Sequence, residues 1–163
     1  MTEATPLQPI LVPVDFSPDS EAALVEACRL ASCLGNSLMV LHVVHDPAET
    51  PGYYAEAAET GQLLHIEDAA NELMGRFLKE CGKKHPECTP LKEAQSLLVV
   101  GLPVTRILEV AEKAKAEMIV MGSKGRTGLR HLMLGSKAEQ VVRLSPIPVM
   151  IVKADAAESS EPE

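Results

Sequence analysis

The residues whose types and spacing most clearly suggest a binding site lie in one segment, GSKGRTGLRHLMLGS, residues 122–136. It contains four glycines and three cationic side chains but no carboxylate, in a chain with 23 acidic and 15 basic residues. Glycines let backbone N–H groups approach an anion closely, because no Cβ stands in the way. A cationic, glycine-rich segment in an acidic protein therefore predicts an anion site.

The spacing of the glycines narrows the class of anion. It is Gly122-x2-Gly125-x9-Gly135-Ser136, and a short helix is predicted from Ser136 onward. A helix N-terminus has unpaired N–H groups and the positive end of a dipole, so Gly135-Ser136 favours a phosphate, to which the Ser136 hydroxyl adds a donor. The local potential is raised by four cations: Lys124, Arg126, Arg130 and Lys137.

Other phosphate-binding motifs are absent from the sequence. The segment matches neither the P-loop pattern nor the G-x-G-x-x-G dinucleotide fingerprint, and no S-G-G-x-D-S loop follows the first predicted strand. These absences count against NAD enzymes and AMP-forming ligases. The bland alternative is that the glycines only mark turns.

Alternating strands and helices are predicted to position this segment. The first helix has a complete set of end signals, with Ser17 as N-cap, Pro18 as its first residue and Gly35 at its end. Further helices are expected over 62–81, 103–115 and 136–144. Buried apolar runs indicate five strands, at 10–14, 37–44, 97–100, 118–121 and 147–152. The alternation predicts an α/β fold, a single doubly wound domain with a five-stranded parallel sheet and helices on both faces.

The strand order decides where a ligand would lie. In such sheets, ligands bind outside the carboxyl ends of the strands, where the winding reverses. For the order 3-2-1-4-5, this crevice lies between the first and fourth strands, where Val14-Asp15-Phe16 would meet the glycine segment. Asp15 could then accept hydrogen bonds from ribose hydroxyls or from an adenine amino group. Its alternative role is a turn or capping residue, for which Ser17 is better placed.

The segments outside these predicted helices and strands are expected to be flexible. Residues 1–8 are interpreted as a flexible N-terminus and 154–163 as a disordered acidic tail, which leaves a domain over 9–153. A long mobile loop is expected over 46–61, in which Tyr53 and Tyr54 would be loop anchors or dimer contacts.

Composition excludes several classes of partner. The net charge of −8 argues against nucleic-acid and anionic-membrane binding, since no broad basic face is available. No apolar run approaches the roughly 18 residues of a membrane span. The N-terminus has no apolar signal-peptide core, so a cytoplasmic location is expected.

The four cysteines are expected to be free thiols in a reducing compartment. Cys81, His85 and Cys88 could supply three zinc ligands, but a fourth is missing and Pro86 interrupts the set. We therefore interpret this stretch as a helix C-terminus followed by a turn, and we predict no metal site.

The whole chain resembles the universal stress protein family, in its ATP-binding branch, a group of adenine nucleotide alpha hydrolase-like folds. The resemblance covers residues 8–153 and rests on ILVPVDFS, LHVV, VGLPVTRI and MIVMGSKGRTGLRHLMLGSKAEQVVRLSPIPVMIVK. The glycine motif with its nine-residue gap is specific to that branch. The family often has a small apolar residue where this chain has Lys137, which leaves the backbone contact intact and could strengthen binding to the terminal phosphate.

The resemblance implies an adenosine pocket and a phosphate cradle. It implies that Pro13, Asp15 and Val43 surround the adenine, with Met121 and the glycine motif around the ribose and phosphates. It also suggests that two copies pair antiparallel along the last strand, 147–152, to form a homodimer. The candidate nucleotide-binding residues are Pro13, Val14, Asp15, Val43, Met121, Gly122, Ser123, Lys124, Gly125, Arg126, Gly135, Ser136 and Lys137.

The leading hypothesis is an ATP-binding regulatory protein of the stress response, a homodimer that responds to nucleotide and controls an unidentified protein partner. The cradle contains no carboxylate of its own for a base or Mg²⁺, which argues against efficient phosphoryl transfer, and no catalytic residue is assigned. Two alternatives stay open at this point: a slow ATPase or phosphotransferase using Asp15 and Mg²⁺, and a structural adaptor that ignores nucleotide. AMP, ADP or a cyclic nucleotide could also replace ATP.

Overall fold

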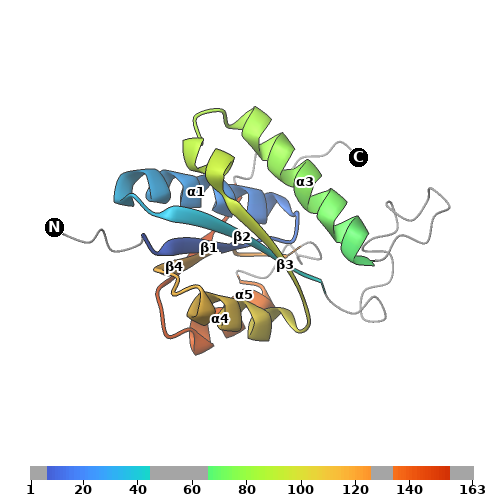
Figure 1. Cartoon of the computed structure of the whole chain (residues 1–163). Coiled ribbons are helices and arrows are strands. Elements are labelled where there is room, and N and C mark those ends of the chain that lie inside the picture. Colours follow the sequence, from blue (N-terminus) through green and yellow to red (C-terminus); the bar gives the residue numbers. More distant parts are fainter. Residues whose placement is uncertain (1–6, 45–65, 126–133, 155–163) are drawn as a thin grey trace.

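The computed structural model describes residues 7–44, 66–125 and 134–154. Most of the predicted N-terminal segment, the loop at 46–61 and nearly all of the acidic tail lie outside these ranges. Figure 1 shows the elements in chain order: β1 (Pro9–Pro13), α1 (Pro18–Leu34), β2 (Ser37–Val44), α3 (Ile66–Lys84), the 3-10 helix η1 (Thr89–Glu93), β3 (Gln95–Val100), α4 (Pro103–Lys113), β4 (Met118–Gly122), α5 (Ser136–Leu144) and β5 (Val149–Val152). Among these helices, none is long and apolar enough to span a bilayer.

The five strands form one parallel sheet in the order β3-β2-β1-β4-β5, which confirms the predicted order. β1 is central, and its Ile10 pairs with Leu38 of β2 on one side and with Met118 of β4 on the other. The winding therefore reverses between β1 and β4. In doubly wound sheets, the carboxyl ends of the two strands at this point frame the ligand crevice.

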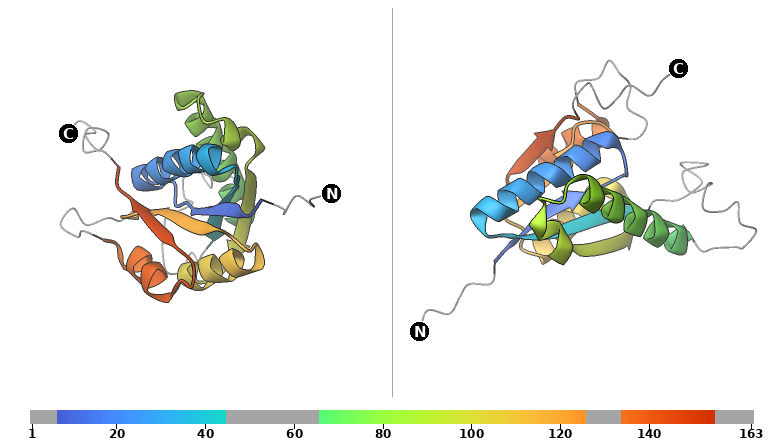
Figure 2. Two further views of the ribbon diagram at one scale, coloured as in Figure 1. Left: turned by 90° about the vertical axis from the view of Figure 1, so that its left-hand side faces the viewer. Right: turned by 90° about the horizontal axis from the view of Figure 1, so that it is seen from above.

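Helices cover both faces of the sheet, with α1 and α3 on one face and α4 and α5 on the other (Figure 2). Side chains of β1 alternate between the two layers: Ile10 and Val12 pack on the α1–α3 side, and Leu11 packs on the α4–α5 side. All three are fully buried. Each aliphatic side chain buried in this way contributes about 1.5–3 kcal/mol, so β1 is a rigid base for the residues at its carboxyl end.

Helix α1 has the ends that its sequence predicts. Ser17 is the N-cap, and its hydroxyl accepts a hydrogen bond from Ser20 N at 3.2 Å. Pro18 is the first helical residue, and Gly35 ends the helix in the left-handed conformation, with φ 76°. Residues that are close in sequence therefore determine where α1 begins, just after the predicted site residue Asp15.

Several element boundaries differ from the sequence prediction. β5 begins at Val149 rather than at 147, because Ile147 N–H donates to the Ser145 hydroxyl at 3.2 Å and Pro148 has no N–H to give to a ladder. α4 ends at Lys113 rather than at about 115, where Lys115 adopts a left-handed backbone with φ 51°.

The remaining boundary differences are small. β1 occupies Pro9–Pro13 instead of 10–14, β3 begins two residues early at Gln95, and β4 continues to Gly122. Helix α3 runs to Lys84, beyond the predicted end at 81, while its predicted first residues, 62–65, lie outside the described ranges. The helix η1 was not predicted.

Candidate functional site

The loops that follow β1 and β4 are in contact at the reversal of winding. A Cβ placed on Gly125 would lie 3.1 Å from Asp15 Oδ2. Asp15 is half-buried, and its Oδ1 accepts hydrogen bonds from Ser17, from the backbone N–H at 3.1 Å and from the hydroxyl. The two candidate segments identified in the sequence therefore meet, with the Asp15 carboxylate beside the second glycine of the motif.

The two ends of the glycine motif also meet. Gly135 N–H donates to Ser123 O at 2.7 Å, and a Cβ on Gly135 would lie 3.2 Å from that carbonyl. The first helical hydrogen bond of α5 runs from Glu139 N to Gly135 O, so the amides of the first turn before Glu139 have no intrahelical acceptor. The N-terminus of α5 thus lies next to the end of β4, where backbone donors and an exposed Ser136 are available to an anion.

Packing within the protein requires glycine at position 122. A Cβ at this position would lie 2.8 Å from the carbonyl carbon and from the Cβ of Asp19, in the first turn of α1. Real Cβ atoms do not approach backbone so closely, so the end of β4 packs on α1 only because residue 122 is glycine. The sequence interpretation assigned Gly122 to the close approach of a phosphate, and it missed this contact.

Asp19 connects three segments and was also missed in the sequence. Its Oδ2 accepts hydrogen bonds from the Ser123 hydroxyl at 2.7 Å and from Lys124 N–H at 2.9 Å. Its Oδ1 accepts from Ala154 N–H at 3.2 Å, just beyond β5. An acidic residue in a first helical turn usually signals only a favourable helix dipole, so the pattern gave no sign of partners more than 100 residues away.

Ser123 is fully buried, and all its polar groups bind within the protein. Its N–H donates to Val152 O at 2.8 Å, its carbonyl accepts from Gly135, and its hydroxyl donates to Asp19. Ser123 therefore holds the loop together, and a role for it in ligand contact stays a prediction.

Three apolar candidates for nucleotide binding lie at the carboxyl ends of the central strands. Val14, Val43 and Met121 are each less than 8% exposed. Val43 and Met121 belong to the α4–α5 side of the core and Val14 to the α1–α3 side. Of the cationic candidates, Lys124 is half-buried and Lys137 is exposed, and Arg126 lies outside the described residues.

The turn after Asp15 has an unusual backbone that aromatic packing supports. Phe16 adopts φ 65°, a left-handed conformation that is uncommon for a side chain of this size. Its ring packs 4.4 Å from the His42 ring and 5.5 Å from the Phe77 ring, between centroids. His42 Nδ1 also lies 2.8 Å from Val14 O. Strained backbone of this kind persists where surrounding packing holds it, and it is often found at ligand sites.

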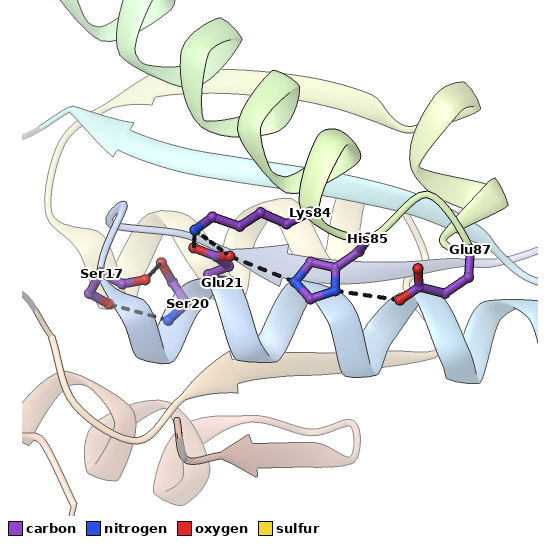
Figure 3. Close-up of polar contacts among 6 residues, drawn as sticks. All are labelled: Ser17, Ser20, Glu21, Lys84, His85 and Glu87. Atoms are coloured by element: carbon purple, nitrogen blue, oxygen red, sulfur yellow. Dashed lines mark hydrogen bonds and ion pairs between the residues drawn. The ribbon is translucent and has the colours of Figure 1, made fainter. Parts of the chain in front are cut away.

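The end of α3 holds the start of α1 in place, as Figure 3 shows. Lys84 Nζ donates to both carboxylate oxygens of Glu21, at 3.0 and 3.1 Å, and His85 Nε2 lies 3.7 Å from the same carboxylate. The hydrogen bond to Glu21 raises the pKa of the Lys84 ammonium. Glu21 N–H in turn donates to Ser17 O, so the contact reaches the N-cap of α1. Since Lys84 is mostly exposed, this pair contributes about 1 kcal/mol at most.

The cysteines take part in packing. All four are free thiols, and Cys28, Cys81 and Cys88 are buried together between α1, α3 and the turn before η1. Burial is the main cause that raises the pKa of Cys28 and of Cys81 to about 12. In the described ranges, no group of three or more potential ligands is arranged to hold a metal ion. His85, considered above as a zinc ligand, lies between the carboxylates of Glu21 and Glu87 instead.

Comparison with known proteins places this geometry in a family. The model of the universal stress protein family matches residues 6–153. The universal stress protein MJ0577 of Methanocaldococcus jannaschii is 30% identical over 152 residues, covering 88% of this chain and 93% of that protein. The universal stress protein YxiE of Bacillus subtilis is 33% identical over 150 residues, covering 88% and 97%.

Solved structures of universal stress proteins superpose on this fold. The structure of MJ0577 superposes with a TM-score of 0.65 at 26% identity and covers 93% of this chain and 99% of that one. A universal stress protein from Archaeoglobus fulgidus, solved in complex with dAMP, has the same fold, with a TM-score of 0.60 at 22% identity and coverage of 91% and 100%. The family model spans nearly the whole described fold, including both loops of the candidate site, and the chain belongs to the universal stress protein family.

Proposed function

We propose that this chain is a regulatory protein that binds an adenine nucleotide, ATP in particular, at the reversal of winding between β1 and β4. The observation that carries the proposal is the contact of Asp15 with Gly125, together with the bond from Gly135 to Ser123. These contacts bring a carboxylate acceptor, a glycine turn and the N-terminus of α5 to one place. Such a set suits a ligand that has both hydroxyl or amino donors and phosphate acceptors.

The two sides of the crevice, the loop after β1 and the glycine motif after β4, suit different parts of the nucleotide. Asp15 is an acceptor and suits ribose hydroxyls or the adenine amino group, while backbone N–H groups, the Ser136 hydroxyl and the Lys124 and Lys137 ammonium groups suit phosphates. Pro13 and Val43 would face the base. The relative from Archaeoglobus fulgidus binds dAMP, so monophosphates belong in the test beside ATP.

We propose regulation rather than turnover, in a cytoplasmic homodimer. Of the two described carboxylates at the site, Asp19 accepts hydrogen bonds from protein donors with both oxygens and Asp15 accepts from Ser17 with Oδ1, so these groups are engaged within the protein, which supports binding over turnover. ATP mixed with stoichiometric protein and Mg²⁺ should stay intact, as followed by chromatography. Hydrolysis that the Asp15→Ala substitution abolishes would instead establish an ATPase.

Thermal unfolding tests binding directly. ATP that binds only the native state should add about 2.7 kcal/mol of stability at a hundredfold excess over its Kd, seen as a shift of several degrees in Tm. Gly125→Val should abolish the shift, because the branched side chain would occupy the space between the Gly125 backbone and Asp15.

Gly75→Val is the matched control for this test. Gly75 lies in α3, and a Cβ there has no heavy atom within 4 Å, so this variant should keep the full shift. The proposed function is wrong if protein freed of bound ligand shows no shift with millimolar ATP, ADP, AMP, dAMP or cAMP, with or without Mg²⁺.

A further inference from the structure

A single residue on α1, Asp19, contacts three consecutive residues of the glycine motif. Asp19 Oδ2 holds the Ser123 hydroxyl at 2.7 Å and Lys124 N–H at 2.9 Å, and the backbone of Asp19 lies directly under Gly122. These partners are separated from Asp19 by 104 and 105 positions in the sequence. The conformation of the turn from 122 to 125 is therefore set from outside the motif.

The burial of Ser123 makes this support strong. Its side chain is fully buried, so its hydroxyl must find an acceptor within the protein, because a buried polar group without a partner is costly. Asp19 supplies that acceptor as a charged group, which makes a stronger hydrogen bond than a neutral one. Ser123 O in turn holds Gly135 N–H, so the support extends from Asp19 to the start of α5.

Asp19 acts through these residues rather than on a ligand. Its second oxygen, Oδ1, accepts from Ala154 N–H at 3.2 Å, so both oxygens bind protein donors. Asp15 lies elsewhere around the motif, with its Oδ2 3.1 Å from the position that a Cβ on Gly125 would take. The two aspartates of the β1–α1 region thus have different positions. Asp15 lies at the ligand side of the glycine motif, and Asp19 lies on the side that packs on α1.

We propose that Asp19 is a positioning residue that preorganises the phosphate side of the site, and this inference rests on the proposed nucleotide function. The residues that it holds, 122–124, lead into Gly125 and contact Gly135, and they do not include the base-side candidates Pro13 and Val43. Loss of Asp19 should therefore weaken the binding of phosphates and leave the binding of the nucleoside nearly intact. A turn held in advance binds more tightly because less conformational freedom is lost on binding.

The experiment compares ATP with adenosine by calorimetry, in wild type and in Asp19→Ala. The preference for ATP over adenosine should fall about tenfold in Asp19→Ala, equivalent to about 1.4 kcal/mol. Asp19→Asn keeps an oxygen acceptor of the same size and should recover the preference to within about threefold of wild type. Glu26→Ala, on the same helix, removes a carboxylate that pairs with the exposed Arg29, and it should leave the preference unchanged.

The outcomes separate this inference from the function on which it rests. A folded Asp19→Ala variant that keeps the wild-type preference, or that loses both ligands in equal proportion, overturns the positioning role. If Asp19→Ala does not fold, Ser123→Ala deletes one of the two bonds from the other side. A lower ATP preference in Ser123→Ala supports the role, and an unchanged one refutes it. Wild-type protein that binds neither ligand refutes the proposed function and this inference together.

Discussion

Two glycines of one motif lack a side chain for different reasons. At Gly122 a Cβ would lie 2.8 Å from the backbone of Asp19, whereas at Gly125 its nearest neighbour would be a side-chain oxygen of Asp15 at 3.1 Å. Neither residue has a left-handed φ, so space rather than conformation decides what each position tolerates. Gly122 belongs to the packing of the fold, and Gly125 faces the candidate ligand.

The difference predicts that the same substitution destabilises the fold much more at Gly122 than at Gly125. Gly122→Ala should lower the free energy of unfolding by about 1–3 kcal/mol, as overpacked sites do, because backbone atoms of α1 must move. Gly125→Ala should change it by less than about 1 kcal/mol, since the Asp15 side chain can shift and the unfolded chain loses entropy. Urea denaturation measures the change in stability for both variants, provided that their m-values equal that of the wild type. Equal destabilisation by the two variants would contradict the assignment.

The buried thiols predict how stability depends on pH. Burial raises the pKa of Cys28 and of Cys81 from 9.0 to about 12. Between these pH values the unfolded chain loses protons that the native state keeps. Stability from this source is therefore complete below pH 9 and falls as the pH rises toward 12, by up to about 1.4 kcal/mol per pH unit for each thiol.

Urea denaturation between pH 8 and 10.5, in the presence of a reductant, tests this dependence. Cys28→Ala should make the alkaline loss of stability shallower, whatever its effect at neutral pH. Cys33→Ala is the control, because Cys33 is exposed and should leave the slope unchanged. Parallel pH profiles for wild type and Cys28→Ala would rule out the buried thiol as the cause.

At the scale of elements, β5 is one of the two edge strands of the sheet, and β3 is the other. β5 is last in the sheet order, and all four of its residues are partly exposed. The carbonyls of Pro148 and Val152 accept from Ile119 N–H and Ser123 N–H of the β4 side, at 2.9 and 2.8 Å. Because backbone groups alternate along a strand, those of Val149 and Ile151 point away from β4. These are the groups that a second copy of the chain would pair with in the proposed homodimer.

This alternation selects the substitution that tests the dimer. Ile151→Pro deletes an outward N–H, so it should shift the chain from dimer to monomer at about ten micromolar while the sheet of each protomer stays intact. Val152→Pro, in contrast, removes an N–H on the β4 side, and we expect it to destabilise the protomer itself. Sedimentation velocity and circular dichroism distinguish the two effects. A wild-type chain that is monomeric at this concentration would exclude the proposed pairing.

At the scale of the whole molecule, the sheet order could be predicted and the support of the site could not. Buried apolar runs such as Ile10–Val12 and end signals such as Ser17 and Gly35 act over a few residues, so a sequence pattern reveals them. The roles of Asp19 and Gly122 depend on contacts between α1 and β4, which exist only once the sheet has assembled. Boundary differences, such as the start of β5 after Pro148, depend on single hydrogen bonds that a pattern does not encode.

The central position of β1 has a consequence for the order in which the chain is made. On the ribosome, β1, β2 and β3 emerge first, and the other edge of β1 waits for Met118 and Ile119 of β4. At about 5–20 residues per second, residues 101–122 take roughly one to four seconds to be added. During that interval β1 is a temporary outer strand, and outer strands invite pairing with other chains. Pro9 and Pro13, at its two ends, offer no N–H to such a neighbour, so this temporary edge presents fewer backbone donors than a strand without proline would.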